Sequence, residues 1–290
     1  KIGIVALAKK ISLNEIQPAI NVFKSWGLEV VVGKTIGAEW NQFGGNDEER
    51  RADIQVMLDD HSIRAVVSAR GGYGSVRIID NIDFNNFLHK PKWLIGFSDV
   101  TVFHSHINKN HNIPTLHATM PVFFHENTNE ALKSIKKAII DGEMLYKIQS
   151  QFPEYCKEGK VESEIIGGNL SILYSLCGSP SSSNTHGKIL FLEDLCEYLY
   201  HTDRMLQNLK RNGFFSNLSG LIIGNFNDMK DGPIPFGKST EKMIFDFCKN
   251  LDIPIFTGFP AGHIKDNRAL IFGEKVLMEV NGGKLKLNLS

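Results

Sequence analysis

Short apolar runs alternate with longer segments of helical spacing through the first half of the chain, and this alternation restricts the fold more than any other feature. Each run has the length and character of a strand that is buried on both faces. Successive strands joined by helices lie parallel, because the helix returns the chain to the end of the sheet from which it started. The sequence therefore predicts a doubly wound, mostly parallel α/β sheet with helices on both faces. The expected strands are residues 2–7, 28–32, 65–69 and 93–95, and the expected helices are 13–25, 48–58, a segment from about Ser75, and 100–110.

The second half of the chain shows a different pattern of expected elements, because strands outnumber helices towards its end. The turn Asn281-Gly282-Gly283 between two alternating segments predicts a closing β-hairpin. Residues 126–164, between the two halves, lose the regular alternation. We therefore expect an α/β domain over residues 1–125, a linker over 126–164 and a smaller, strand-rich α+β domain over 165–290. Within this second domain the expected helices are 170–177, 197–211 and 240–250, and the expected strands are 188–192, 221–223, 268–272, 276–280 and 285–289.

Charge and composition exclude several classes of partner. Lys and Arg together number 32 and so do Asp and Glu, so the chain has no net charge with which to attract nucleic acid. No apolar run approaches the roughly 20 residues that cross a bilayer, so a membrane is not expected as a partner. The four cysteines are scattered without a CxxC pair, which favours buried thiols in a reducing, cytoplasmic compartment. His125-Glu126 lacks the second histidine of H-E-x-x-H, and we expect neither a metal nor a cofactor.

Residues 92–101 place a serine where a buried strand gives way to a helix. The apolar run 93–95 is stopped by Gly96, Ser98 lies in the turn, and helical spacing starts at Val100. This geometry exposes a hydroxyl above the edge of a sheet and directs backbone N–H groups to the same point. The G-x-S-x-G pattern is incomplete, because Val100 occupies the position of its second glycine. The sequence leaves two interpretations open for Ser98, a nucleophile or a helix N-cap.

A glycine-rich run, Gly71-Gly72-Tyr73-Gly74, follows the preceding predicted strand. It lacks the G-x-G-x-x-G spacing of a dinucleotide site, and no Gly-Lys-Ser/Thr follows it as in a P-loop. One interpretation is a tight turn that needs a positive φ angle. The other is a loop whose backbone N–H groups hold a developing oxyanion.

Two further polar residues, Glu193 and His263, share with Ser98 a position soon after an apolar run. A serine nucleophile needs a base, a histidine near neutral pH can take its proton, and a carboxylate can orient that histidine. The chain order Ser, Glu, His is also that of the α/β-hydrolases. Each residue keeps a second interpretation: Glu193 as an acid that starts a helix, and His263 as a loop histidine, since nine other histidines could equally supply the base.

Five motifs occur in order along the chain. They are Ala69-Arg70-Gly71-Gly72-Tyr73-Gly74, Ile95-Gly96-Phe97-Ser98-Asp99, Gly167-Gly168-Asn169-Leu170, Phe191-Leu192-Glu193-Asp194 and Gly262-His263. Together they resemble the LD-carboxypeptidase family, the murein tetrapeptide carboxypeptidases of serine peptidase family S66. The similarity runs from the first predicted strand to the final hairpin. It implies a flavodoxin- or amidotransferase-like first domain and a catalytic triad divided between two domains.

The resemblance assigns roles residue by residue. It implies Ser98 as the nucleophile, His263 as the general acid and base, and Glu193 as the carboxylate that orients the histidine. It also implies that the backbone N–H groups of Gly72 and Asp99 form the oxyanion hole, which agrees with the functional interpretation of both turns.

The family's activity implies removal of the terminal D-alanine from murein tetrapeptides in cell-wall recycling. The family also implies a homodimer. Because the substrate ends in a free carboxylate, we expect a cation in the site. Arg204, in the predicted helix after Glu193, is the first candidate and Arg70 the second, while Asn169 is expected to hydrogen-bond substrate amides.

Two other functions compete with this one. Some relatives are immunity peptidases that cleave peptidyl-nucleotide antibiotics, and they need an aromatic loop that stacks on a base. The linker offers Phe152 and Tyr155 but no tryptophan, which weighs against that function. The other alternative is a non-catalytic protein that binds cell-wall peptides, which nothing in the sequence favours because all three triad residue types are present.

Overall fold

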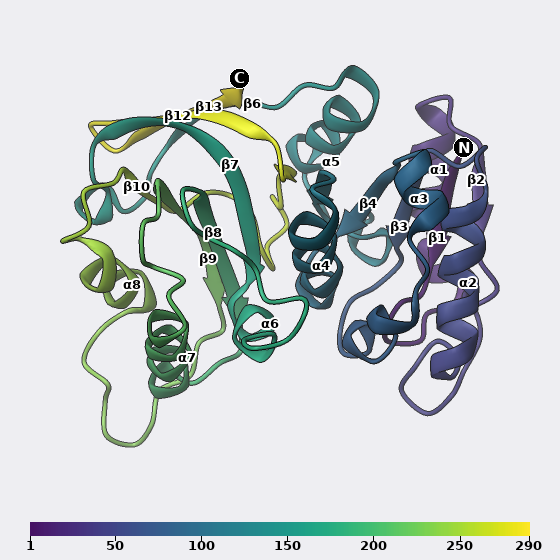
Figure 1. The fold of residues 1–290 in the computed structure, drawn as a ribbon, viewed down its shortest axis with the longest axis horizontal. Coiled ribbons are helices and arrows are strands. Elements are labelled where there is room, and N and C mark those ends of the chain that lie inside the picture. The colour runs from purple at the N-terminus through teal and green to yellow at the C-terminus, as the bar shows by residue number, and fades with distance from the viewer.

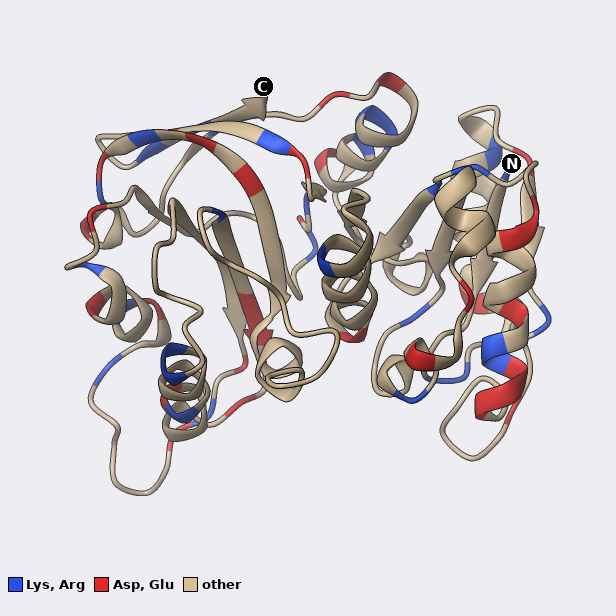
Figure 2. Cartoon of the chain, in the orientation of Figure 1, with Lys and Arg blue, Asp and Glu red and all other residues tan.

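Two sheets, one in each lobe of the molecule, organise the fold. The computed structural model describes residues 1–290, and Figure 1 shows the first half of the chain in one lobe and most of the second half in the other. Acidic and basic residues are spread over both lobes (Figure 2). No helix combines the length and the apolar character that crossing a membrane requires.

The first sheet has the strand order β11-β5-β4-β3-β1-β2. All neighbours from β2 to β5 pair in parallel, and only β11 pairs antiparallel, with β5. The predicted doubly wound, mostly parallel sheet is therefore confirmed, and β2-β1-β3-β4-β5 is the flavodoxin-like order. The strands are β1 (Ile2–Val5), β2 (Val30–Val32), β3 (Ala65–Ser68), β4 (Trp93–Gly96), β5 (Thr115–His117) and β11 (Leu270–Phe272).

Helices cover both faces of this sheet. Two start with a capping box, in which an N-cap side chain and a glutamate three residues on satisfy each other's backbone N–H groups. They are α1 (Leu13–Ser25), capped by Ser12, and α2 (Asp47–Asp59), capped by Asn46. α1 packs on the face that carries Ile4, whereas α2 and α4 (Thr101–His111) pack on the face that carries Val66.

The helix expected from about Ser75 is not a continuous helix. Two 3₁₀ turns, η1 (Ser75–Arg77) and η2 (Ile79–Asn81), precede the short α3 (Asn85–His89). Aspartate and asparagine compete with a helix by hydrogen-bonding to nearby backbone groups. Asp83 does so here, since its Oδ1 accepts a 2.8 Å hydrogen bond from the backbone N–H of Asn85.

The second sheet has the order β10-β9-β8-β7-β12-β13-β6. β7 is long and curved in Figure 1, and it joins the two parts of this sheet. Its residues 165–169 pair in parallel with β8, and residues 159–164 pair antiparallel with β12. The strands are β6 (Leu145–Gln149), β7 (Gly159–Asn169), β8 (Ile189–Leu195), β9 (Gly220–Asn227), β10 (Ile255–Thr257), β12 (Lys275–Asn281) and β13 (Lys284–Leu289).

Helices α6 (Leu170–Ser175), α7 (Leu199–Arg211) and α8 (Thr240–Cys248) cover one face of the second sheet. The opposite face, with Phe191 and Ile222, belongs to a cluster of 35 buried apolar side chains that also includes residues of α1 and β11. Because this cluster draws on both sheets, the two lobes share one core.

The segment 126–164, expected to cross between the lobes as a linker, contains ordered elements. α5 (Asn129–Lys136) continues into a π turn, η5 (Lys137–Asp141), and β6 is an edge strand of the second sheet. Conversely, β11 comes from the second half of the chain but pairs with β5 in the first sheet. The domain limits stay a prediction, but the exchange of strands explains how residues from both halves reach one site.

Candidate active site

Ser98 lies at the carboxyl end of β4, in a backbone conformation that side chains rarely adopt. Its φ angle is 61°, in the left-handed region, and the 3₁₀ turn η3 (Ser98–Val100) leads directly into α4. Strained residues of this kind concentrate at functional sites. Gly96 makes the turn possible, because a Cβ there would lie 2.7 Å from Val100 Cγ2. The strand–turn–helix geometry predicted around Ser98 is therefore present.

The glycine loop after β3 runs against Ser98. A Cβ on Gly71 would lie 3.3 Å from the Cβ of Ser98, and Gly72 has a φ angle of 121°. Asp99 ties this loop to the serine turn, because its Oδ2 accepts a 2.9 Å hydrogen bond from the backbone N–H of Ser75. Burial raises the pKa of the Asp99 carboxyl. The structure thus brings the loop of Gly72 and the turn of Asp99 to the same place.

Glu193 and His263 form a hydrogen-bonded pair. Glu193 is fully buried in β8, and its Oε2 lies 2.8 Å from Nδ1 of His263. A Cβ on Gly262 would lie 3.1 Å from Glu193, so a glycine before the histidine lets the loop come this close. Burial lowers the pKa of His263, but the charge of Glu193 and the hydrogen bond outweigh it, so the pKa is raised above its ordinary value. With Nδ1 occupied, Nε2 is left to exchange a proton.

The imidazole of His263 packs on the residue before the serine. Its ring centroid lies 4.8 Å from that of Phe97, and Phe97 directly precedes Ser98. The pair of Glu193 and His263 therefore lies against the turn that carries Ser98, at the junction of the two lobes. Of the two hydrogen bonds that a working triad needs, the one between His263 and Glu193 is present in this structure.

Gly168 lets the end of β7 approach the first lobe beside the site, and Gly167 lets β7 lie close to β8. A Cβ on Gly168 would lie 2.5 Å from Oγ1 of Thr101, the first residue of α4, and one on Gly167 would lie 2.0 Å from the carbonyl oxygen of Phe191. The backbone N–H of Asn169 also donates to Thr101 Oγ1 over 3.1 Å. These contacts hold the end of β7, in the second lobe, against Thr101, which lies three residues after Ser98 in the chain.

Asn169 and Asp194 form a buried polar pair behind Glu193. Asn169 Nδ2 donates to Asp194 Oδ1 over 2.9 Å, and Asn169 Oδ1 accepts from Ser171 Oγ and from the backbone N–H of Ile172. Burial, followed by the charge of Glu193, raises the pKa of Asp194 to about 7. The side chain of Asn169, predicted to bind substrate, is thus mostly engaged inside the protein and has one amide hydrogen left for a ligand.

The two predicted carboxylate-binding arginines have partners of their own. The guanidinium of Arg204, exposed on α7, lies 5.2 Å from the centre of the Tyr200 ring, and Arg70 lies 3.9 Å from Glu15. A third cation, Lys9, was not predicted from the sequence. A Cβ on Gly72 would lie 2.6 Å from Lys9 Cγ, so the lysine stem crosses the glycine loop beside the site. The only signal in the sequence is that Lys9 follows the first strand at the same edge of the sheet.

A cavity of about 480 Å³ adjoins His263 at the junction of the lobes. None of its other lining residues was predicted as a site residue, although Lys265 lies only two positions after the predicted base. Its walls are partly apolar, with Phe97, Phe123, Leu195 and Ile264, and its polar lining includes Glu126, Asn127, Asn227 and Lys265.

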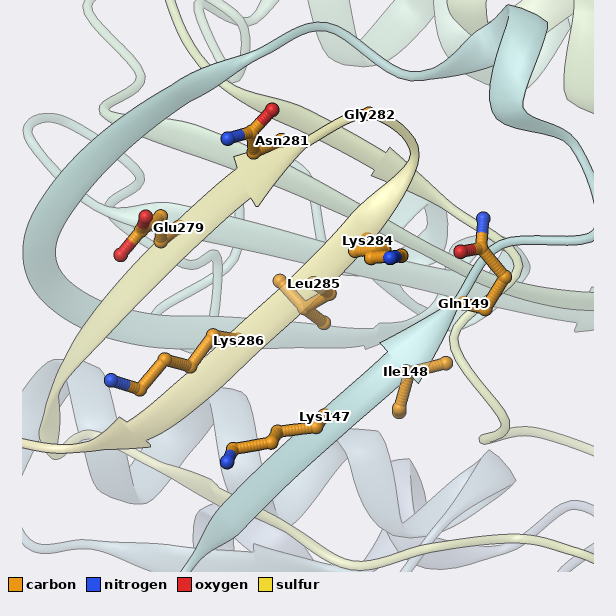
Figure 3. Close-up of a pocket in the computed structure, with 9 residues that line it drawn as sticks. All are labelled: Lys147, Ile148, Gln149, Glu279, Asn281, Gly282, Lys284, Leu285 and Lys286. Atoms are coloured by element: carbon orange, nitrogen blue, oxygen red, sulfur yellow. The ribbon is translucent and has the colours of Figure 1, made fainter.

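A larger hollow of about 530 Å³ lies on the outer face of β6, β12 and β13 (Figure 3). Lys147 and Lys286 stand on neighbouring strands there as a direct cross-strand pair. It contains none of the predicted triad residues, whereas His263 lines the smaller cavity at the junction.

Comparisons with known proteins agree with this assignment. The family model described as the LD-carboxypeptidase N-terminal domain matches residues 2–118, and the one described as the C-terminal domain matches residues 162–278. A Bacillus subtilis protein described as a probable murein peptide carboxypeptidase is 31% identical over 280 residues, which cover 96% of this chain and 88% of that relative.

Solved structures give the same result. The crystal structure of muramoyltetrapeptide carboxypeptidase from Oxalobacter formigenes superposes with a TM-score of 0.89 at 28% identity, covering 100% of this chain and 98% of that one. The microcin C7 self immunity protein MccF superposes with a TM-score of 0.87 at 21% identity, covering 100% of this chain and 96% of that one, and this likeness shows the shared fold alone.

Fold and comparisons together define a two-lobed hydrolase of mixed α/β architecture. The chain belongs to the LD-carboxypeptidase family, as its motifs predicted, and it is a carboxypeptidase.

Proposed function

We propose that this protein is a serine-type LD-carboxypeptidase that removes the terminal D-alanine from murein tetrapeptides. The observation that carries the proposal is the 2.8 Å hydrogen bond between buried Glu193 and His263, beside the strained turn of Ser98. The printed descriptions of the Bacillus and Oxalobacter relatives, which name murein peptides and muramoyltetrapeptides, support the substrate.

Ser98 and His263 carry the first half of the proposed reaction. His263 Nε2 accepts the proton of Ser98 Oγ as the oxygen attacks the carbonyl carbon of the scissile amide. Glu193 holds the other ring nitrogen and stabilises the imidazolium that forms. The backbone N–H groups of Gly72 and Asp99 hold the negative oxygen of the tetrahedral intermediate.

The second half releases two products. His263 gives its proton to the amine of D-alanine, the C–N bond breaks, and the shortened peptide stays attached to Ser98 as an ester. A water molecule then gives a proton to His263 and attacks the ester carbon. Ser98 leaves as a hydroxyl with the proton from His263, so the peptide acid is released and the enzyme is restored.

The terminal carboxylate of the substrate calls for a cation in the site. Arg204 and Arg70 are the candidates from the sequence, and Lys9 is a third from the structure. The geometry favours Lys9 for two reasons. The aliphatic part of its side chain lies against Gly72. The ion pair with Glu39 is made by the neighbouring Lys10, so it does not engage Lys9. Asn169 contributes its remaining amide hydrogen to a substrate carbonyl.

The direct test is incubation of the protein with murein tetrapeptide, with released D-alanine measured by mass spectrometry. The wild type is expected to release it and the Ser98→Ala variant is not. A wild-type protein that binds the tetrapeptide but releases no D-alanine would instead support the non-catalytic binding function.

Nothing in the site favours the immunity-peptidase alternative. The linker aromatics that could stack on a base are engaged with each other, since the rings of Phe152 and Tyr155 are stacked at 6.4 Å and Tyr155 also packs near Phe245. We therefore retain the tetrapeptide as substrate.

We also propose that the enzyme works in the cytoplasm and as a homodimer. Cell fractionation tests the compartment. Light scattering on the purified protein tests the assembly, with a single-chain mass of 32.5 kDa counting against the dimer.

A further inference from the structure

Arg50, on α2, is a charged side chain with no exposed surface. A guanidinium loses its water on burial, so it needs partners inside the protein. One partner is the carboxylate of Asp47, three residues earlier on the same helix. Neither residue takes part in the proposed reaction, so the burial of Arg50 calls for another explanation.

The guanidinium of Arg50 holds two loops at the edge of the first sheet. Its Nη1 donates to the carbonyl oxygen of Leu7, which follows β1, and over 3.0 Å to that of Gly74, in the glycine loop after β3. A Cβ on Gly74 would lie 2.7 Å from this nitrogen, so the loop comes this close only with glycine there. The centre of the Phe43 ring lies 4.9 Å from the guanidinium carbon. Arg50 therefore fixes the glycine loop against the segment that follows β1.

One peptide group carries this restraint to the turn of Ser98. Its carbonyl belongs to Gly74 and accepts from Arg50. Its N–H belongs to Ser75 and donates to Asp99 Oδ2 over 2.9 Å. Because a peptide group is planar and resists twisting, its two ends cannot turn independently. Asp99 is buried and directly follows Ser98, so a shift of the guanidinium is passed on to the turn of the serine.

We propose that Arg50 is a positioning residue for the oxyanion hole. Through this peptide group it sets the distance between the backbone N–H groups of Gly72 and Asp99, the two donors of the hole. Arg50 itself has no surface from which to touch the substrate. The inference rests on the proposed function, because the hole has a role only if Ser98 attacks a carbonyl group.

The expected effect falls on the rate and not on substrate binding. An oxyanion hole holds an oxygen that becomes negative only as the reaction proceeds, so it binds the transition state better than the substrate. Loss of Arg50 is therefore expected to lower kcat and to leave KM unchanged. A displacement of the donors by about 1 Å costs about 10²-fold in rate.

The first test compares two neighbouring arginines of α2 in the full-length protein, with D-alanine release from murein tetrapeptide as the readout. Arg50→Met is expected to lower kcat by about 10²-fold at unchanged KM. Arg51→Met is the matched control and is expected to change neither constant, because Arg51 is partly exposed and paired with Glu48. Thermal unfolding shows whether each variant is folded. If Arg50→Met is not, Arg50→Lys takes its place with the same expected changes, because one ammonium group cannot span the acceptors that a planar guanidinium reaches.

A transition-state mimic separates a displaced oxyanion hole from a loss of folded enzyme. The probe is the tripeptide part of the substrate with a boronic acid in place of its terminal carboxyl group. Ser98 Oγ forms a bond to boron while its proton passes to His263, which gives a tetrahedral, negatively charged adduct. Its Ki is expected to rise in Arg50→Met by the same factor by which kcat/KM falls. A partly unfolded preparation would lower the rate but leave this Ki unchanged.

A double-mutant cycle tests the route through the peptide group. Asp99→Leu removes the acceptor of the Ser75 N–H but keeps the backbone N–H of residue 99. It is expected to lower kcat as Arg50→Met does. Residues that act through one shared group are not additive, so the double variant is expected to be about as slow as the slower single variant.

Three results would overturn the inference and leave the proposed function standing. They are wild-type kcat and Ki in a folded Arg50 variant, a rise of KM at unchanged kcat, and losses that add in the double variant. A wild-type protein that releases no D-alanine would overturn the proposed function, and this inference with it.

Discussion

Glu193 Oε2 lies 2.8 Å from Nδ1 of His263, and the two residues reach this contact from elements 70 positions apart in the chain. Glu193 stands in the middle of the second sheet, whereas His263 lies in the loop that leads towards the first. The proposed catalytic pair therefore forms only when β8 and the loop before β11 are both in place.

Glu193→Gln is expected to keep the shape of the pair and remove its charge. Because the charge of Glu193 raises the pKa of His263, the acidic limb of the kcat/KM profile should move to lower pH in the variant. The imidazolium also loses its stabilisation, so kcat should fall by about 10²- to 10⁴-fold. Rates from pH 4 to pH 9 check both effects. Glu164→Gln, which breaks the 2.6 Å ion pair with Lys188, is the control, and an unmoved acidic limb would contradict the assignment of Glu193.

Ser98→Ala and Ser98→Gly should both abolish turnover, but they should differ in stability. Ser98 holds a φ angle of 61°, which glycine adopts freely and alanine does not. The glycine variant should therefore be more stable than the alanine variant by about 1 kcal/mol. Urea unfolding measures the difference, and a fluorophosphonate probe that labels the wild type should label neither variant. Near-normal turnover in either variant would show that Ser98 is not the nucleophile.

Replacing the cationic residue that binds the terminal carboxylate of the substrate should raise KM. Replacing the residue that binds the carboxylate by methionine weakens substrate binding by about ten-fold while the chemistry at Ser98 continues. We expect this result for Lys9→Met, whose side chain crosses Gly72. Arg204→Met and Arg70→Met are measured in parallel, and an unchanged KM eliminates each candidate in turn.

The first sheet could be predicted because its signals are local. The strands and helices up to α4 show their periods within one segment, and their ends differ by only a few residues from the prediction, except that the helix expected from about Ser75 is replaced by two 3₁₀ turns and the short α3. β5 was missed because its three residues, Thr115–His117, include two polar side chains that become fully buried only in the folded protein. The place of β11 in this sheet had no local signal, since its partner β5 lies about 150 residues earlier in the chain.

The residues of the candidate site also divide into those with a local signal in the sequence and those without one. Ser98, Glu193 and His263 follow apolar runs, so their types and positions are readable in the sequence. Lys9, Glu126 and Lys265 lie outside the helices and strands and belong to no periodic pattern. Only the folded arrangement shows that Lys9 crosses the glycine loop and that the other two line one cavity.

Gly168→Ala should disturb the site without touching a reacting atom. A Cβ there would lie 2.5 Å from Thr101 Oγ1, and the φ angle of 134° already disfavours a side chain. The end of β7 must then move away from α4, which changes the distance between the lobe of Ser98 and the lobe of Glu193. We expect kcat to fall more than KM rises, because a small misplacement of reacting groups costs about 10²-fold in rate. Thr101→Ala in the same chain removes the closest contact but not the backbone strain, so it should restore part of the rate. If the double variant is as slow as Gly168→Ala alone, the crowding at Thr101 is not what holds the two lobes in register.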